Sequence, residues 1–170
     1  MVSDEAMMTL ALREAARGLE RGEVPVGAVL VKDGRILARA HNACLTMNDP
    51  TAHAEVLALR EGGRILGNYR LMDTTLYVTL EPCIMCTGAL VHARVSRLVY
   101  GAADPKGGAV ASLHRLLADE RLNHRVLVTA GILEGPCGEI LSGFFRKKRL
   151  SSPLRSDPED ERSGEIPKWS

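Results

Sequence analysis

Apolar residues recur at helical spacing in several stretches of the chain. The first stretch places Met7, Met8, Ala11 and Ala15 on one stripe, and Gly22 follows its end. The same reasoning predicts helices over residues 4–21, 52–65, 83–93 and 133–150, with a shorter helical piece at 113–117.

Short apolar runs of β-branched residues lie between these helices. They predict strands over residues 26–31, 35–40, 75–80, 98–100 and 126–129. Asp33-Gly34 separates the first two runs, a pair typical of a tight hairpin. Because the later strands alternate with helices, the pattern favours an α/β fold with a sheet covered by helices.

Length and composition are those of one compact domain. The chain has 170 residues, 45% of them hydrophobic, which is enough for a single buried core. We expect this domain to span residues 1–150. Residues 151–170 are polar and have little to bury, so we expect a disordered tail there.

Charge and hydropathy exclude few partners but make a membrane protein unexpected. The formal net charge is +1, so the overall charge predicts no particular partner. The longest strongly apolar stretch, 24–31, contains Pro25 and Gly27 and is far shorter than the roughly 20 residues of a membrane helix. Because no targeting segment is visible, we expect a cytoplasmic protein.

The cysteines suggest metal or redox chemistry. Without a secretory signal, a close pair such as Cys83 and Cys86 is more often metal-binding or redox-active than structural. Residues three apart share a helix face, so both sulfurs can reach one ion. Cys44 and Cys137 have no evident partner and are expected to pack in the ordinary way.

Three residues are persuasive metal ligands: His53, Cys83 and Cys86. Zinc prefers sulfur and imidazole donors in tetrahedral geometry. A structural zinc site uses four protein ligands, whereas a three-ligand site leaves a position for water, the catalytic arrangement. The count therefore favours a catalytic zinc.

Glu55 is the fourth functional group, expected to move protons and not to bind the metal. Positions 53 and 55 lie about 200° apart around a helix, so both can approach one ion only near the beginning of the helix. The turn at 49–51 predicts such a beginning, and Pro82 predicts another before the cysteines. Two helix N-termini are therefore expected to meet at the site.

At this point a family resemblance emerges. His53-Ala54-Glu55 followed by Pro82-Cys83-Ile84-Met85-Cys86 resembles the signature of the zinc-dependent nucleobase deaminases. The chain is also similar to the bacterial tRNA-specific adenosine deaminases of that superfamily over most of residues 5–150. The segments that carry this similarity are 23–29, 49–55, 68–71, 76–83, 123–126 and 144–146.

The resemblance implies a fold, a reaction and partners. The fold is the three-layer α/β/α cytidine-deaminase-like sandwich with a five-stranded mixed sheet, in a homodimer with one Zn²⁺ per subunit. The reaction is hydrolytic deamination of adenosine to inosine at the wobble position of a tRNA anticodon loop, with Glu55 transferring protons. Unpaired loop bases suit such a pocket because they are already partly unstacked.

The resemblance also implies substrate contacts at Asn42, Asp104, Phe145 and Arg146. Asn42 would hydrogen-bond the nucleoside, and Asp104 would accept from a ribose hydroxyl. Phe145 and Arg146 would contact RNA by stacking and by charge. Ordinary alternatives exist for each: a turn asparagine, an Asp-Pro turn, and a helix end with packed aromatics and favourable cations.

Two positions depart from the family pattern, and neither bears on the zinc chemistry. Ala103 stands where a basic residue is common, and His41 stands where an aromatic residue is common.

Three other readings stay open at this level. A related deaminase could act on a free base or nucleoside, because the metal motifs do not distinguish substrates. A zinc-stabilised binding module would need a fourth protein ligand, for which the candidates are His41, His92, His114 and His124. A thioredoxin-like redox pair at Cys83 and Cys86 would leave His53 and Glu55 unexplained.

Overall fold

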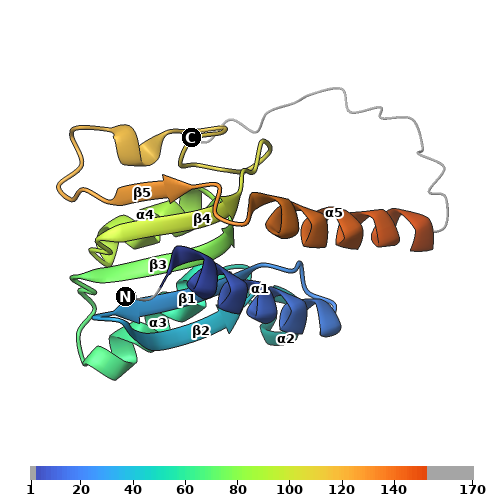
Figure 1. Cartoon of the computed structure of the whole chain (residues 1–170), viewed down its shortest axis with the longest axis horizontal. Coiled ribbons are helices and arrows are strands. Elements are labelled where there is room, and N and C mark those ends of the chain that lie inside the picture. Colours follow the sequence, from blue (N-terminus) through green and yellow to red (C-terminus); the bar gives the residue numbers. More distant parts are fainter. Residues whose placement is uncertain (1–2, 153–170) are drawn as a thin grey trace, which may run out of the picture.

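A computed structural model describes residues 3–152, and the rest of the expected tail, 153–170, lies outside the described residues. Five strands form one sheet in the order β2-β1-β3-β4-β5 (Figure 1). The strands are β1 (Gly27–Lys32), β2 (Arg35–His41), β3 (Thr74–Leu80), β4 (Arg97–Ala102) and β5 (Leu127–Ala130). β1 is antiparallel to β2 and β3, whereas β3, β4 and β5 run parallel, so the predicted mixed sheet is confirmed.

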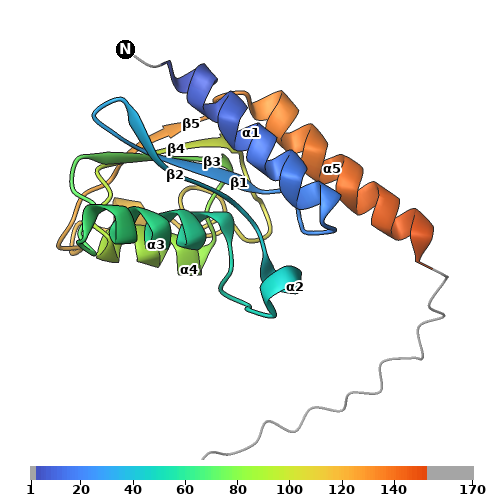
Figure 2. The same cartoon turned by 90° about the horizontal axis from the view of Figure 1, so that it is seen from below.

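Helices cover both faces of this sheet, which gives the predicted three layers (Figure 2). On one face lie α1 (Asp4–Glu20) and α5 (Glu134–Ser151). On the other lie α3 (Ala54–Leu66) and α4 (Ile84–His92). None of the helices within 3–152 is long and apolar enough to cross a membrane.

The core is two apolar layers separated by the sheet. Successive strand side chains point to opposite faces. In β1, Leu30 joins the cluster under α3 and α4, while its neighbour Val29 joins the cluster under α1. The central strands are buried on both faces, which explains their nearly continuous apolar sequences.

Two local predictions need correction. The helix expected over 113–117 is only a 3₁₀ turn, Leu116–Ala118, because the segment before it is held by hydrogen bonds to the buried carboxylate of Glu81. A short helix, α2 (Cys44–Met47), was not predicted, since four residues leave no periodicity to detect.

The topology gathers one end of the sheet into a site. The parallel strands β3 and β4 finish in register, with Leu80 opposite Ala102. β2 finishes at the same edge, because His41 pairs with Gly27, where β1 begins. The segments that follow β2, β3 and β4 therefore leave the sheet side by side, as expected for ligand sites in α/β folds.

Candidate metal centre and active site

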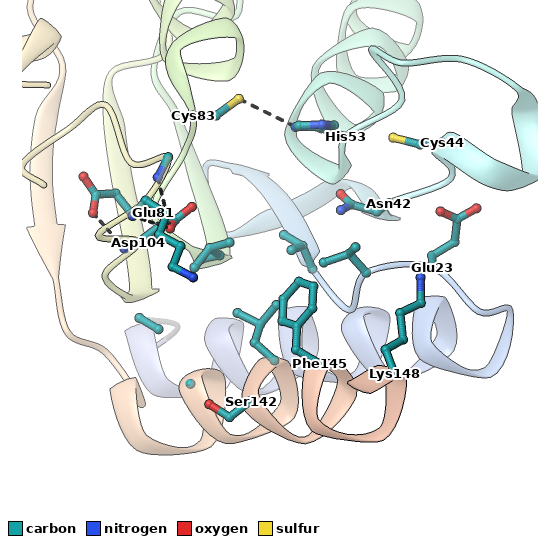
Figure 3. Close-up of a pocket in the computed structure, with 18 of the residues that line it drawn as sticks. Glu23, Asn42, Cys44, His53, Glu81, Cys83, Asp104, Ser142, Phe145 and Lys148 are labelled. Atoms are coloured by element: carbon teal, nitrogen blue, oxygen red, sulfur yellow. Dashed lines mark hydrogen bonds between the residues drawn. The ribbon is translucent and has the colours of Figure 1, made fainter. Parts of the chain in front are cut away.

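The three predicted metal ligands lie together at two helix N-termini. His53 is the N-cap of α3, Cys83 is the N-cap of α4, and Cys86 lies in the first turn of α4. Their donor atoms all lie within 4.8 Å of one another. The His53 Nδ1 atom is 3.7 Å from the Cys83 Sγ atom and 3.5 Å from the Cys86 Sγ atom (Figure 3 shows His53 and Cys83). The structure thus brings the three predicted ligands together.

These distances fit a tetrahedral zinc ion. With bonds of 2.0–2.3 Å to nitrogen and sulfur, neighbouring tetrahedral ligands lie about 3.5 Å apart. Across residues 3–152, no fourth His, Cys, Asp or Glu joins this group. A closed four-ligand site therefore has no support in the described residues. His124, one of the candidates for a fourth ligand, instead forms a hydrogen bond between its Nε2 atom and the Val95 carbonyl at 2.7 Å.

The electrostatics favour thiolate at this position. A hydrogen bond with Cys86 is the main reason that the pKa of the Cys83 thiol falls to about 3, and His53 lowers it further. The same contact raises the pKa of Cys86, and a hydrogen bond with Cys83 raises the pKa of His53. Cys83 thus favours the thiolate, which is the form of cysteine that binds a metal.

Glu55 lies in the first turn of α3 and is buried, with 4% of its surface exposed. Burial raises the pKa of its carboxyl to about 7, with partial compensation from a backbone hydrogen bond and from His53. A carboxyl that titrates near neutrality can both accept and donate a proton. Its position beside the donors, outside their group, matches the expected separation of roles.

Asn42 directly follows β2 and has an additional role that the sequence did not reveal. Its Oδ1 atom accepts from the backbone N–H of Ala54 at 2.8 Å and thereby caps α3, whose N-cap residue makes no side-chain cap bond. The side chain is buried and lines the cavity beside His53 (Figure 3). Its Nδ2 atom makes no hydrogen bond to residues 3–152 and is the donor left for a ligand.

A cavity of about 1000 Å³ extends from His53 and Glu55 toward α5. One wall follows β2 and includes Asn42 and Cys44, so Cys44 lines the cavity besides donating to the Ala52 carbonyl. The opposite wall is the loop after β4, including Asp104. Cys137, in contrast, is fully buried beneath Gly101, as expected for a packing residue.

α5 contributes the outer part of the cavity. Phe145 is 44% exposed and lines the cavity together with Arg146 (Figure 3 shows Phe145). Its neighbour Phe144 is buried, and the two rings pack edge to face with centroids 5.2 Å apart. The structure thus assigns the packing alternative to Phe144, while Phe145 faces the cavity.

The two departures from the family pattern differ in their surroundings. The His41 ring lies 2.8 Å from the Asn42 carbonyl and packs close to Gly18 of α1. Ala103 is exposed and lines the cavity directly before Asp104.

Two buried carboxylates at the cavity were missed by sequence reasoning. Glu23 accepts from the backbone N–H groups of Leu45 and Thr46, and Glu81 accepts from the loop after β4. Burial opposes ionisation of Glu81, but these hydrogen bonds together lower its pKa to about 2. The available signal was an acidic residue beside an apolar stretch: Glu23 directly precedes residues 24–31, and Glu81 directly follows β3.

Fold and site together define a class: a deaminase-type α/β/α sandwich with three side chains that could hold a metal ion. The family model of the MafB19-like deaminases matches residues 2–149. The tRNA-specific adenosine deaminase of Bacillus subtilis is 52% identical over 149 residues, covering 88% of this chain and 92% of that protein. The tRNA-specific adenosine deaminase of Haemophilus influenzae is 50% identical over 147 residues, covering 86% and 85%.

A solved structure of a tRNA deaminase is similar to this chain in both fold and sequence. It comes from a study of A-to-I editing by tRNA:A34 deaminases at the wobble position of transfer RNA. It superimposes with a TM-score of 0.77 at 50% identity and covers 79% of this chain and 98% of that chain. The chain belongs to this deaminase family, among the bacterial tRNA-specific adenosine deaminases.

Proposed function

We propose that this protein hydrolytically deaminates adenosine to inosine at the wobble position of a tRNA anticodon loop. Water replaces the exocyclic amino group, so adenosine and water yield inosine and ammonia. The carrying observation is the buried Glu55 beside the three donors, at the inner end of a cavity that extends to α5. The named activity of relatives that are about 50% identical supports the choice of tRNA adenosine over a free base.

Zinc is the metal that fits the donor set. His53, Cys83 and Cys86 would hold one ion per chain, because two thiols and an imidazole at these separations match its preferred ligands. When bound, zinc supplies the Lewis acidity that makes a water molecule nucleophilic at neutral pH.

Glu55 moves the protons. It takes a proton from the attacking water and delivers it to the purine ring, then assists departure of the amino group as ammonia. Its raised pKa, about 7, matches a group that must accept and donate in one cycle. Burial also keeps bulk water from competing for the proton.

The cavity walls supply the substrate contacts. Asn42 donates from Nδ2 to the nucleoside while Oδ1 stays on Ala54. Asp104 uses Oδ1 to accept from the N–H groups of Lys106 and Gly107, which leaves Oδ2 to accept from a ribose hydroxyl. Phe145 stacks on a neighbouring base, and Arg146 contacts phosphate.

Assembly and location complete the proposal. The catalytic unit is residues 1–150, acting as a homodimer whose second copy helps to shape the RNA surface. Large apolar side chains exposed on α2 and at the start of α4, including Leu45 and Ile84, are available for burial by another chain. Light scattering at several protein concentrations measures whether the protein is a dimer. The cytoplasm is the expected location, since the substrate is tRNA.

The proposed activity is tested on an anticodon stem-loop containing the wobble adenosine. Inosine is measured for the wild-type protein and Glu55→Gln, with zinc content determined on the same samples. The variant should retain its metal and lose at least about 100-fold in rate, because the proton carrier is gone. Free adenosine, cytidine and guanine are tested separately as alternative substrates. Faster turnover of one of these, or an unaffected variant, would refute the proposal.

A further inference from the structure

Glu81 is a buried side chain that the chemistry above does not use. It directly follows β3 and is 2% exposed. Its Oε1 atom accepts from three successive backbone N–H groups, those of 110, 111 and 112, at 3.1, 2.7 and 2.9 Å. Its Oε2 atom accepts from the Asp104 N–H at 3.0 Å and from the Ser112 hydroxyl. Five hydrogen bonds from one loop thus converge on one side chain.

The loop is fitted around this carboxylate. A Cβ atom at Gly108 would overlap the Glu81 carboxylate, lying within 2.6 Å of both oxygens, so a larger residue there would displace the carboxylate from its donors. The backbone is joined as well: the Ala109 N–H donates to the Pro82 carbonyl at 2.8 Å, and Gly108 forms an isolated β-bridge with Cys83. The loop 104–112 is therefore attached to the segment that delivers a metal-ligand candidate.

The same loop carries Asp104 into the cavity wall (Figure 3). Both backbone polar groups of Asp104 are held: its N–H donates to Glu81, and its carbonyl accepts from the Gly108 N–H at 2.8 Å. Its side chain is oriented by the two N–H groups on Oδ1. Only the first of these attachments reaches outside the loop, and it ends on Glu81.

We propose that Glu81 is a positioning residue for the substrate, which acts by holding the loop 104–112 so that Asp104 presents Oδ2 to the ribose. This inference rests on the proposed function. Residues 81–83 would thereby fix two parts of the cavity relative to each other: Asp104, which contacts the ribose, and Cys83, which is a metal-ligand candidate. Both contacts would then be correctly spaced in the folded protein before RNA arrives.

A carboxylate suits this task better than its amide. All five groups that point at Glu81 donate, and an ionised carboxylate only accepts. In Glu81→Gln, one oxygen still serves the three amides at 110–112, while the new NH₂ group faces the N–H of Asp104. The substitution preserves shape and removes the acceptor that the Asp104 N–H shares with the Ser112 hydroxyl. The hydroxyl can rotate and accept from the new NH₂ group, whereas the Asp104 N–H can only donate.

Amide hydrogen exchange tests the structural half of the inference. Glu81→Gln should increase exchange about tenfold or more at Asp104, as expected when one buried hydrogen bond to a charged group is lost. Glu23→Gln is the matched control, because Glu23 is equally buried and accepts from Leu45 and Thr46 on the opposite wall. It should loosen 45–46 and leave Asp104 unchanged. Unchanged exchange at Asp104 in Glu81→Gln would overturn the inference.

Deamination kinetics test the functional half. In Glu81→Gln, KM for the stem-loop should rise about tenfold with little change in kcat and with zinc retained, because a binding contact is misplaced. If Glu81 acts through Asp104, adding Glu81→Gln to Asp104→Asn should raise KM less than about twofold further. The effect of Glu23→Gln on KM should instead multiply with that of Asp104→Asn, because the two residues lie on opposite walls. Multiplicative effects of Glu81→Gln would assign it a merely structural role and overturn the inference.

The two proposals fail in different ways. A wild-type protein that forms no inosine refutes the proposed function, whereas the exchange measurement judges the role of Glu81 without any turnover. Circular dichroism and thermal unfolding of each variant establish that it is folded. If Glu81→Gln does not fold, Glu81→Asp takes its place, because the shorter side chain withdraws the acceptor from the Asp104 N–H and keeps the charge; unchanged exchange at Asp104 in that variant overturns the inference.

Discussion

Asn42 caps a helix with one end of its amide and faces the cavity with the other. The two roles separate by substitution. Asn42→Asp keeps an oxygen for the Ala54 N–H at the positive end of α3, but it loses the donor. Asn42→Ala loses both.

We therefore expect Asn42→Ala to lower the free energy of unfolding by about 1 kcal/mol, and Asn42→Asp to leave it nearly unchanged. Both variants should lose deamination activity, because neither donates to the nucleoside. Denaturant unfolding and inosine formation measure the two effects. An active Asn42→Asp would contradict the substrate role, and an equally stable Asn42→Ala would contradict the capping role.

Residue chemistry was predictable where it depended on local spacing. The pair Cys83 and Cys86, and the placement of His53 and Glu55 at a helix start, followed from helical geometry. The capping role of Asn42 and the loop contacts of Glu81 did not, because each side chain accepts from backbone groups 12 or more residues away. Such contacts exist only once the sheet has brought the segments together.

At the scale of elements, α5 presents two adjacent aromatic residues with different surroundings. Phe145 is 44% exposed at the cavity, and Phe144 is 7% exposed in the core. Phe145→Ala should weaken binding of the stem-loop by about 1–3 kcal/mol through lost stacking, with little change in stability. Phe144→Ala should instead lower stability by about 3–5 kcal/mol. Fluorescence anisotropy and thermal unfolding distinguish them; reversed effects would contradict the assignment.

α1 is attached to the sheet by an ion pair. Asp4 accepts from both terminal nitrogens of Arg97 at 2.9 and 2.7 Å and from the Tyr77 hydroxyl at 3.0 Å. The hydrogen bonds from Arg97 are the main reason that the pKa of Asp4 falls below its usual 3.8, although burial opposes the change. A carboxylate with a lowered folded pKa stabilises the fold above its unfolded pKa, and this stabilisation disappears as pH falls through the folded value.

Asp4→Asn should therefore cost about 1 kcal/mol of unfolding free energy at pH 7, a modest value because the pair is partly exposed. The difference from wild type should shrink as pH falls below about 4. Glu5→Gln is the control, since Glu5 lies in the same helical turn and makes no ion pair within residues 3–152. Urea unfolding between pH 3 and pH 7 measures both variants. A difference between Asp4→Asn and wild type that is as large at pH 3 as at pH 7 would contradict the account.

Elements with strong periodicity were predicted to within about two residues. α2 was missed because its four residues depend on an external acceptor, Glu23, at its first turn. The segment 113–117 was overpredicted for a related reason, since the residues before it are fixed by Glu81 and not by helical bonds. In both places a distant carboxylate outweighs local propensity.

At the scale of the whole molecule, the strand order explains why one cavity collects residues from distant segments. The ends of β2, β3 and β4 meet at one edge, and the N-termini of α3 and α4 lie beside it. The sequence predicted a sheet between helices, but periodicity alone does not specify strand order. The five-stranded mixed sheet was expected from family resemblance, and the superposition with a relative agrees with it.

The central claim is that one metal ion, held by three side chains, makes this cavity catalytic. The most direct test removes the metal with a chelator and restores zinc stepwise, while inosine formation is followed against the metal-to-protein ratio. Activity should rise linearly and stop at about one zinc per chain, and Cys86→Ala should neither bind the ion firmly nor regain activity. Full activity of the metal-free protein, or of Cys86→Ala without bound zinc, would contradict the account.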